Sequence, residues 1–141
     1  MKRLLIFLIL LLLASPASAQ LSGGGFFGRV KDCNAQGAVN QTASATLVTG
    51  TAGQRIYVCS LLLVSAGAQL VSLVEGTGTN CATGIAALIG GTSASLSLAA
   101  DSGFSTIAPF AWLSTQTTGN NLCLLQSGAG NISGTVSYRK Q

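Results

Sequence analysis

Short runs of apolar and β-branched residues, separated by turns rich in glycine, make up the chain from about residue 41 onward. The strongest run, 55–66, is apolar almost throughout, which predicts a central strand covered on both faces. A turn at 66–68 leads into another apolar run, 69–75, so these two runs are expected to form a hairpin. In 132–139 apolar and polar residues alternate, as they do in a half-buried strand.

The number and spacing of such runs predict the fold class. The predicted strands are 41–49, 55–66, 69–75, 85–89, 95–99, 104–113, 122–126 and 132–139, the last two forming a terminal hairpin. The run 85–89 also fits one helical turn, and Pro109 confines 104–113 to an edge or bent strand. About eight short strands favour an all-β domain over residues 33–141. Its expected form is a single antiparallel β-sandwich, jelly-roll-like, with an immunoglobulin-like sandwich as the alternative.

The N-terminus has a different pattern from the rest of the chain. A basic start precedes an uninterrupted apolar segment, 4–14, and small residues follow as far as Ala19. This order predicts a secretory signal peptide, residues 1–19, with a signal helix and with cleavage before Gln20. An apolar segment of about 11 residues is too short for a bilayer core, which needs roughly 20. We therefore expect no stable membrane anchor after cleavage.

Charge is scarce along the chain. Charged residues are 7% of the sequence, against about 25% in an ordinary soluble domain. The full chain has a net charge of +4, and removal of residues 1–19 leaves 122 residues with five cationic and three anionic side chains, a net charge of +2. The remaining cationic pairs, Arg29 with Lys31 and Arg139 with Lys140, are too small for a nucleic-acid site. A surface with so little charge favours self-association or packing on a larger protein surface.

Four cysteines remain after residue 19, and their number and spacing predict disulfides. A metal site needs closely spaced cysteine pairs or histidines, and the sequence has neither. An even number of cysteines in a short exported domain indicates two disulfides, with three connectivities open. The hairpin around residue 67 favours Cys59–Cys81, which leaves Cys33–Cys123. Together with the signal peptide, this predicts a periplasmic, cell-surface or extracellular protein.

Residues 20–32 are predicted to form a flexible N-terminal arm. Three consecutive glycines at 23–25 precede Phe26 and Phe27, and glycine-rich segments are flexible. Two adjacent phenylalanines are unusual on such an arm. They are expected either to fold back over an edge of the sandwich or to serve as a docking arm that inserts into a neighbouring subunit.

The residues needed for catalysis are largely missing, so the protein is not expected to be an enzyme. Histidine is absent, and general acid–base catalysis then requires paired carboxylates. The carboxylates after residue 19, Asp32, Glu75 and Asp101, lie far apart in sequence and in different predicted loops. No glycine-rich phosphate loop precedes a helix, and no cofactor or metal is expected.

Three aromatic residues could line a ligand site. Phe104, Phe110 and Trp112 lie close together in sequence, and aromatic side chains form platforms for sugars. The same residues pack more commonly in a hydrophobic core, so both interpretations stay open. The first predicts a secreted carbohydrate-binding module.

Several segments carry a resemblance to other proteins, namely 55–59, 71–84, 121–124 and 133–138. With them, most of the domain resembles a loose group of small, cysteine-containing proteins of bacterial, prophage and phage genomes. The resemblance implies a compact β-sandwich, and some members lie among virion structural genes, which implies a decoration or fibre role. This sequence differs from most virion proteins in its predicted signal peptide, because virion proteins generally assemble without export. The difference favours a periplasmic or surface role.

Taken together, these features favour an exported, disulfide-stapled, non-catalytic structural or binding module of the cell envelope or surface. A phage-related virion decoration or accessory protein is the specific alternative, and the carbohydrate-binding module is the next. An enzyme whose carboxylates assemble only in the folded chain is the remaining hypothesis.

Overall fold

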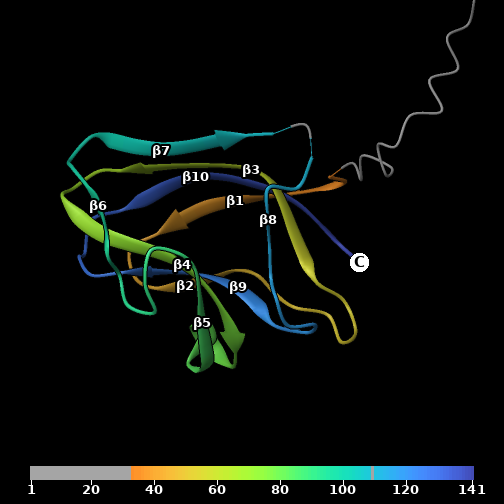
Figure 1. The fold of residues 1–141 in the computed structure, drawn as a ribbon. Coiled ribbons are helices and arrows are strands. Elements are labelled where there is room, and N and C mark those ends of the chain that lie inside the picture. The colour runs from red at the N-terminus through yellow and green to blue at the C-terminus, as the bar shows by residue number, and fades with distance from the viewer. Residues whose placement is uncertain (1–32, 109) are drawn as a thin grey trace, which may run out of the picture.

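The structure is a computed structural model that describes residues 33–108 and 110–141. These residues form ten β-strands in two antiparallel sheets, with one short 3₁₀ turn, η1, at Thr79–Cys81, and the described part contains no α-helix (Figure 1). The sequence-based prediction of an all-β, antiparallel protein is confirmed.

Each sheet has four strands in a row and a short fifth strand at one edge. The first sheet has the order β1 (Ala35–Gln41), β10 (Ile132–Lys140), β3 (Ile56–Ser65) and β7 (Ser102–Ile107), with β8 (Leu113–Ser114) also pairing with β3. The second sheet has the order β2 (Ala45–Val48), β9 (Asn121–Gln126), β4 (Gln69–Thr77) and β5 (Thr83–Ile89), with β6 (Leu96–Leu98) also pairing with β4. The predicted strand at 85–89 is therefore present as β5, and 104–113 divides into β7 and β8 at the edge of the first sheet.

The strands pair as nested partners along the chain. β1 pairs with β10, β2 with β9, β3 with β7 and β4 with β5, so the first half of the domain runs antiparallel to the second half in reverse order. Consecutive strands from β1 to β4 alternate between the two sheets. The two hairpins expected from adjacency in sequence are therefore wrong, because β3 and β4 lie in different sheets, as do β9 and β10.

The two sheets enclose one apolar core. Alternate residues of β3 and β10 supply Leu61, Leu63 and Val136 from the first sheet, and β4 and β9 supply Leu73 and Leu124 from the second. This arrangement explains the period of two in the sequence, because successive side chains of a strand point to opposite faces.

One expectation about β3 needs correction. The strand was predicted to be covered on both faces, but Leu62 is 44% exposed and Val64 is 38% exposed. Both lie between buried neighbours in the strand, so they point away from the core. The apolar run at 55–66 thus combines one core-facing row with one exposed row.

Each disulfide joins a cysteine in a strand to a cysteine outside the strands. Cys33, just before β1, is bonded to Cys59 in β3, and Cys81 in the 3₁₀ turn is bonded to Cys123 in β9. The expected pairs Cys59–Cys81 and Cys33–Cys123 are wrong, because they require a β3–β4 hairpin. Two disulfides indicate that the chain folds in an oxidising compartment.

Two predicted segments lie outside the described residues. They are the signal peptide, 1–19, and the arm, 20–32, with its phenylalanines Phe26 and Phe27. Among the residues that are described, no helix has the length and apolar character needed to cross a membrane.

Candidate interaction surface

The outward face of the first sheet carries small hydroxyl side chains and exposed aliphatic side chains. Leu62 in β3 is paired with Ser105 in β7 and with Thr135 in β10, and residues directly opposite each other across strands project from the same face. Ser60 is paired with Ile107, which is 90% exposed. No charged side chain belongs to these two rows, so the surface that they form can exclude water without burying a charge.

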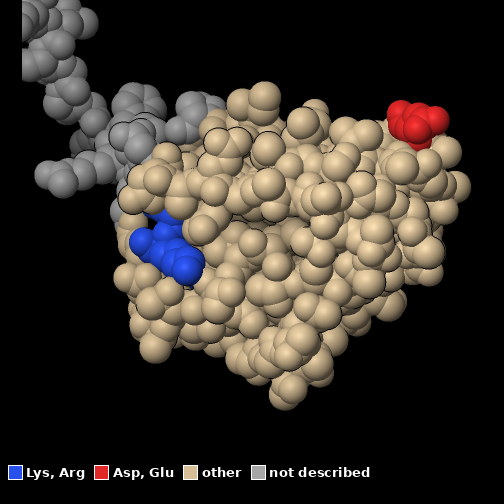
Figure 2. Space-filling view, turned by 180° about the vertical axis from the view of Figure 1, so that it is seen from behind, with Lys and Arg blue, Asp and Glu red and all other residues tan. Residues whose placement is uncertain are grey.

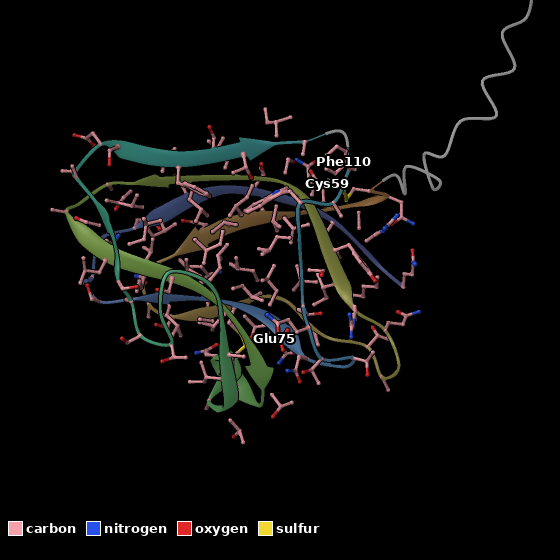
Figure 3. All side chains as sticks on the ribbon, in the orientation of Figure 1. Cys59, Glu75 and Phe110 are labelled. Carbon is pink, nitrogen blue, oxygen red and sulfur yellow. A yellow bond between two sulfur atoms is a disulfide. The ribbon has the colours of Figure 1, made fainter. Side chains whose placement is uncertain are left out.

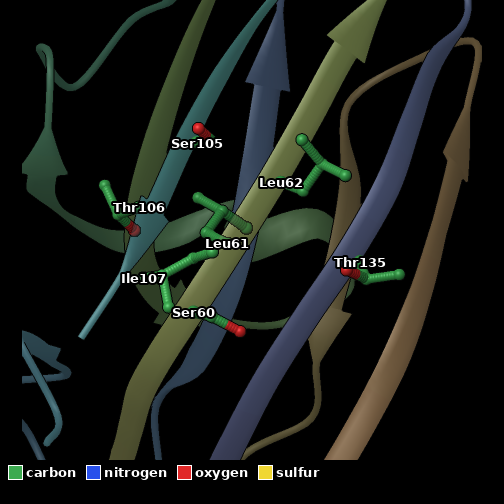
Figure 4. Close-up of a pocket in the computed structure, with 7 residues that line it drawn as sticks. All are labelled: Ser60, Leu61, Leu62, Ser105, Thr106, Ile107 and Thr135. Atoms are coloured by element: carbon green, nitrogen blue, oxygen red, sulfur yellow. The ribbon is translucent and has the colours of Figure 1, made fainter. Parts of the chain in front are cut away.

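A shallow pocket of about 320 Å³ opens on this face. We call it the outer pocket, and it is lined by Ser60, Leu61, Leu62, Ser105, Thr106, Ile107 and Thr135. Figure 4 shows that these residues come from three neighbouring strands, with Leu62 on β3, Ile107 on β7 and Thr135 on β10. The mixture of aliphatic groups and hydroxyls suits an uncharged, partly apolar ligand group.

The chain leaves the sheet beside the outer pocket and then returns to it. The backbone N–H of Ala108 donates to the carbonyl of Cys59 at 3.1 Å, and the N–H of Trp112 donates to the carbonyl of Val58 at 3.1 Å. Phe110 lies between these two hydrogen bonds in sequence, and its side chain is 57% exposed (Figure 3 labels Phe110). Ile107 and Phe110 are the most exposed of the large hydrophobic side chains that the structure describes.

The three aromatic residues considered for sugar binding do not share one surface. Phe104 and Trp112 are partly buried and pack against the core, with ring centroids 6.5 Å apart and planes tilted by 57°. The indole Nε1 of Trp112 is buried and has no hydrogen-bond partner among the described residues. Phe110 is the member of the three with a largely exposed side chain. The geometry therefore provides one exposed ring and no platform of several rings.

A buried carboxylate closes one end of the space between the sheets. Glu75 continues the inward-facing row of β4 and is 1% exposed. Its carboxylate accepts hydrogen bonds from the backbone N–H groups of Gln116 and Thr117 and from the side-chain amide of Asn120, at 3.2 Å for Thr117 and 3.3 Å for Asn120. We call these four residues the Glu75 cluster (Figure 3 labels Glu75).

The Glu75 cluster has a structural explanation. Next to it in sequence, Thr115 exchanges hydrogen bonds with the backbone of Ile56 in the first sheet, at 2.9 Å each. The loop after β8 is thus fixed to both sheets, through Ile56 on one side and Glu75 on the other. Glu75 lies inside β4, in agreement with the predicted strand 69–75 and not with its grouping among loop carboxylates, and its oxygens accept hydrogen bonds from backbone donors.

The described carboxylates do not form a catalytic pair. Asp101 lies in the turn before β7, where its N–H donates to the carbonyl of Ser65 at 2.8 Å, and the Ser65 hydroxyl accepts from Gln69 at the start of β4. Glu75 is six residues further along β4, which is roughly 20 Å at about 3.3 Å per residue. Asp32 lies outside the described residues. In the part of the chain that is described, no cluster of three histidine, cysteine or acidic residues could hold a metal ion.

The charged side chains gather at the ends of the strands. Arg55, Arg139 and Lys140 lie where β3 begins and β10 ends, and Arg139 stacks over the ring of Tyr57 with its guanidinium carbon 4.8 Å from the centroid. Asp101 lies near Ser65, at the other end of β3. Figure 2 shows a basic group and an acidic group at opposite ends of one face, with an uncharged surface between them.

The edge strands are uncharged as well. The first sheet ends in β1 on one side and in β7 and β8 on the other, and the second ends in β2 and in β5 and β6. None of these six strands contains Lys, Arg, Asp or Glu. Exposed edges in natural proteins are commonly protected by charged side chains, especially lysine. The six edge strands lack this protection by charge. The low overall charge of the sequence predicts a surface with little charge, but it does not predict that the edge strands have none.

Comparison with family models, curated proteins and solved structures finds no match for this chain.

Proposed function

We propose that this protein is an exported, non-catalytic structural module that associates with copies of itself or with a larger protein surface. We place it in the periplasm, on the cell surface or in the medium. The two disulfides support an oxidising location, and the order of residues 1–19 supports export by a signal peptide.

The observation that carries this proposal is the absence of charge from every described edge strand. β1 is the most favourable of these edges, because it has seven residues and pairs with β10 without any register shift. A regular, uncharged edge offers a row of backbone N–H and C=O groups to another strand. Addition of a strand from a partner would satisfy these groups and extend the sheet.

We further propose that the fold is a jelly roll and that the protein belongs to the group it resembles. The nested pairing of β1, β2, β3 and β4 with β10, β9, β7 and β5 supports the jelly roll, because it wraps eight main strands into two sheets as one folded ribbon. Membership of the group is supported by the segments 55–59, 71–84 and 121–124, each of which contains a cysteine.

Sedimentation velocity over a series of protein concentrations tests the proposal. The full-length chain, produced in a bacterium and purified after export, is expected to associate as its concentration rises. Ala38→Lys, at an exposed position in the middle of β1, is expected to weaken this association. Thr51→Lys is the matched control, because it adds the same charge in an exposed turn. Sedimentation as a monomer at every concentration, with no bound partner, would reject the proposal.

A role in the virion is the second candidate. The nested strand pairing favours it, because jelly rolls build many viral capsid proteins, although they also build lectins and other proteins. Intact-mass spectrometry on separated periplasm, medium and virus-like particles distinguishes the two. A chain beginning at Gln20 and concentrated in particles would favour the virion role, and the same chain in the periplasm or medium would favour the envelope role.

A further inference from the structure

The N-terminal arm joins the domain at Cys33, close to the outer pocket. Cys33 is held to Cys59 by a disulfide, with the two Cα atoms 6.2 Å apart. Ser60, the next residue of β3, lines the outer pocket. The carbonyl of Cys59 also accepts the N–H of Ala108, which follows the pocket residue Ile107. The position at which residues 20–32 join the domain is therefore fixed beside the pocket.

The chemistry of the pocket matches the aromatic pair of the arm. The pocket combines aliphatic side chains with hydroxyl groups and has no charged lining residue. Its volume of about 320 Å³ lies at the lower end of the range of about 300–1,000 Å³ for small-molecule sites. Phe26 and Phe27 are the only aromatic residues between Gln20 and Cys33. Aromatic side chains gain most from leaving water, and Ile107 offers them an exposed apolar contact.

The tether favours the arm of the same molecule over the arm of a second copy. Six Cα–Cα steps separate Phe27 from Cys33, which allows a span of up to roughly 20 Å. The pocket begins one residue after Cys59, well within that span. A segment linked in this way has an effective concentration in the millimolar range, above the concentration of free copies in a dilute solution.

We propose that Phe26 and Phe27 occupy the outer pocket of their own chain. The arm then covers Leu62 and Ile107, two of the apolar side chains that the domain leaves exposed on this face. This inference does not depend on self-association, because the pocket and the tether lie in one molecule. It assigns the arm a defined receiving surface, whereas the sequence left open whether the arm folds back or docks on a neighbour.

Photo-crosslinking tests the proposal. The photoreactive phenylalanine analogue p-benzoylphenylalanine is placed at position 27 of the full-length chain, and the purified protein is irradiated at low micromolar concentration. The expected product has the mass of a monomer, and peptide mapping is expected to join residue 27 to 60–62 or 105–107. The same analogue at Leu21 is the matched control, and it is expected to give a several-fold lower yield at these positions.

A second variant separates docking from folding. Ile107→Ser should fold normally because the side chain is 90% exposed, and an unchanged thermal transition checks this. It is expected to lower the crosslink from position 27 several-fold. A dimer-mass product would assign the pocket to a second copy and overturn the proposal. Crosslinks elsewhere on the domain, or yields equal to those from Leu21, would also overturn it. A monomer crosslink in a protein that never self-associates would reject only the assembly proposal.

Discussion

The Glu75 cluster and the outer pocket use polar and apolar groups in opposite ways. In the Glu75 cluster a charged side chain is 1% exposed, and its carboxylate oxygens accept from three different donors. In the outer pocket, aliphatic side chains face solvent, with Ile107 at 90% exposure. A buried charge with its hydrogen bonds made is explained by the fold alone. Apolar groups that the fold leaves exposed are the better indication of function.

Each region also has its own disulfide. Cys81 and Cys123 are completely buried and form a small cluster with Val74, the residue before Glu75. Cys33 is partly exposed and ties the start of β1 to Cys59 near the outer pocket. We therefore expect the Cys81–Cys123 disulfide to stabilise the interior and the Cys33–Cys59 disulfide mainly to fix the end of the edge strand β1.

Removing the buried disulfide should have the largest effect. The Cys81–Cys123 bond closes a sequence separation of 42 residues, and the chain-entropy model gives about 4 kcal/mol for a loop of this size. The cavity left by Cys81→Ala with Cys123→Ala adds to that loss. Urea unfolding of the double variant measures the sum.

The matched control is Cys33→Ala with Cys59→Ala. Its loop has a separation of 26 residues, for which the same model gives about 3.5 kcal/mol. Because Cys33 is partly exposed and Cys59 is 8% exposed, the cavity cost is expected to be smaller than at Cys81 and Cys123, which are both 0% exposed. Equal losses in the two double variants would show that burial of the bond does not matter.

Glu75→Ala should have the next largest effect. The substitution leaves backbone donors of Gln116 and Thr117 and the amide of Asn120 without their acceptor, and unsatisfied buried groups cost about 1–3 kcal/mol each. Because these costs are not additive, we expect a loss of about 3 kcal/mol in the free energy of unfolding. Chemical denaturation measures it.

Asp101→Asn is the control for loss of a negative charge. Asp101 is exposed and has a φ of 56°, a conformation that asparagine tolerates. A change within about 0.5 kcal/mol is expected for such a surface position. If Asp101→Asn and Glu75→Ala lost the same stability, net charge rather than the Glu75 cluster would explain both results.

The sequence predicted the class of fold better than its connections. Period-two patterns and glycine turns identify antiparallel strands, and Pro109 correctly indicates the edge position of β7. Pairing is harder to predict, because the chain between β3 and β4 crosses from one sheet to the other. Contacts distant in sequence help to fix that crossing: the N–H of Ala66 donates to the carbonyl of Asn131, and the side-chain amide of Gln69 donates to the carbonyl of Gly130. A local hydrogen bond joins the same amide to the hydroxyl of Ser65.

The disulfides and the outer pocket share this difficulty. The favoured pair Cys59–Cys81 follows from a local hairpin, and the wrong hairpin gives the wrong pair. The outer pocket combines β3, β7 and β10, which are neighbours in space through pairings of long sequence range. Its one local signal is the run Leu61–Leu62–Leu63. Strict alternation within this run would have indicated that Leu62 faces outward.

The smallest predicted effect compares two adjacent leucines of β3 directly. Leu63 is 2% exposed and Leu62 is 44% exposed. Leu63→Ala creates a cavity in the core and should lower the free energy of unfolding by about 2.5 kcal/mol, whereas Leu62→Ala removes only part of the contact with the docked arm and should lower it by about 1 kcal/mol or less. Thermal and urea unfolding of the two variants measure the difference. The same Leu→Ala substitution thus compares the stability contributions of the two faces of β3. A loss at Leu62 as large as that at Leu63 would mean that Leu62 is packed in solution as tightly as a core residue, which is more than contact with a docked arm accounts for.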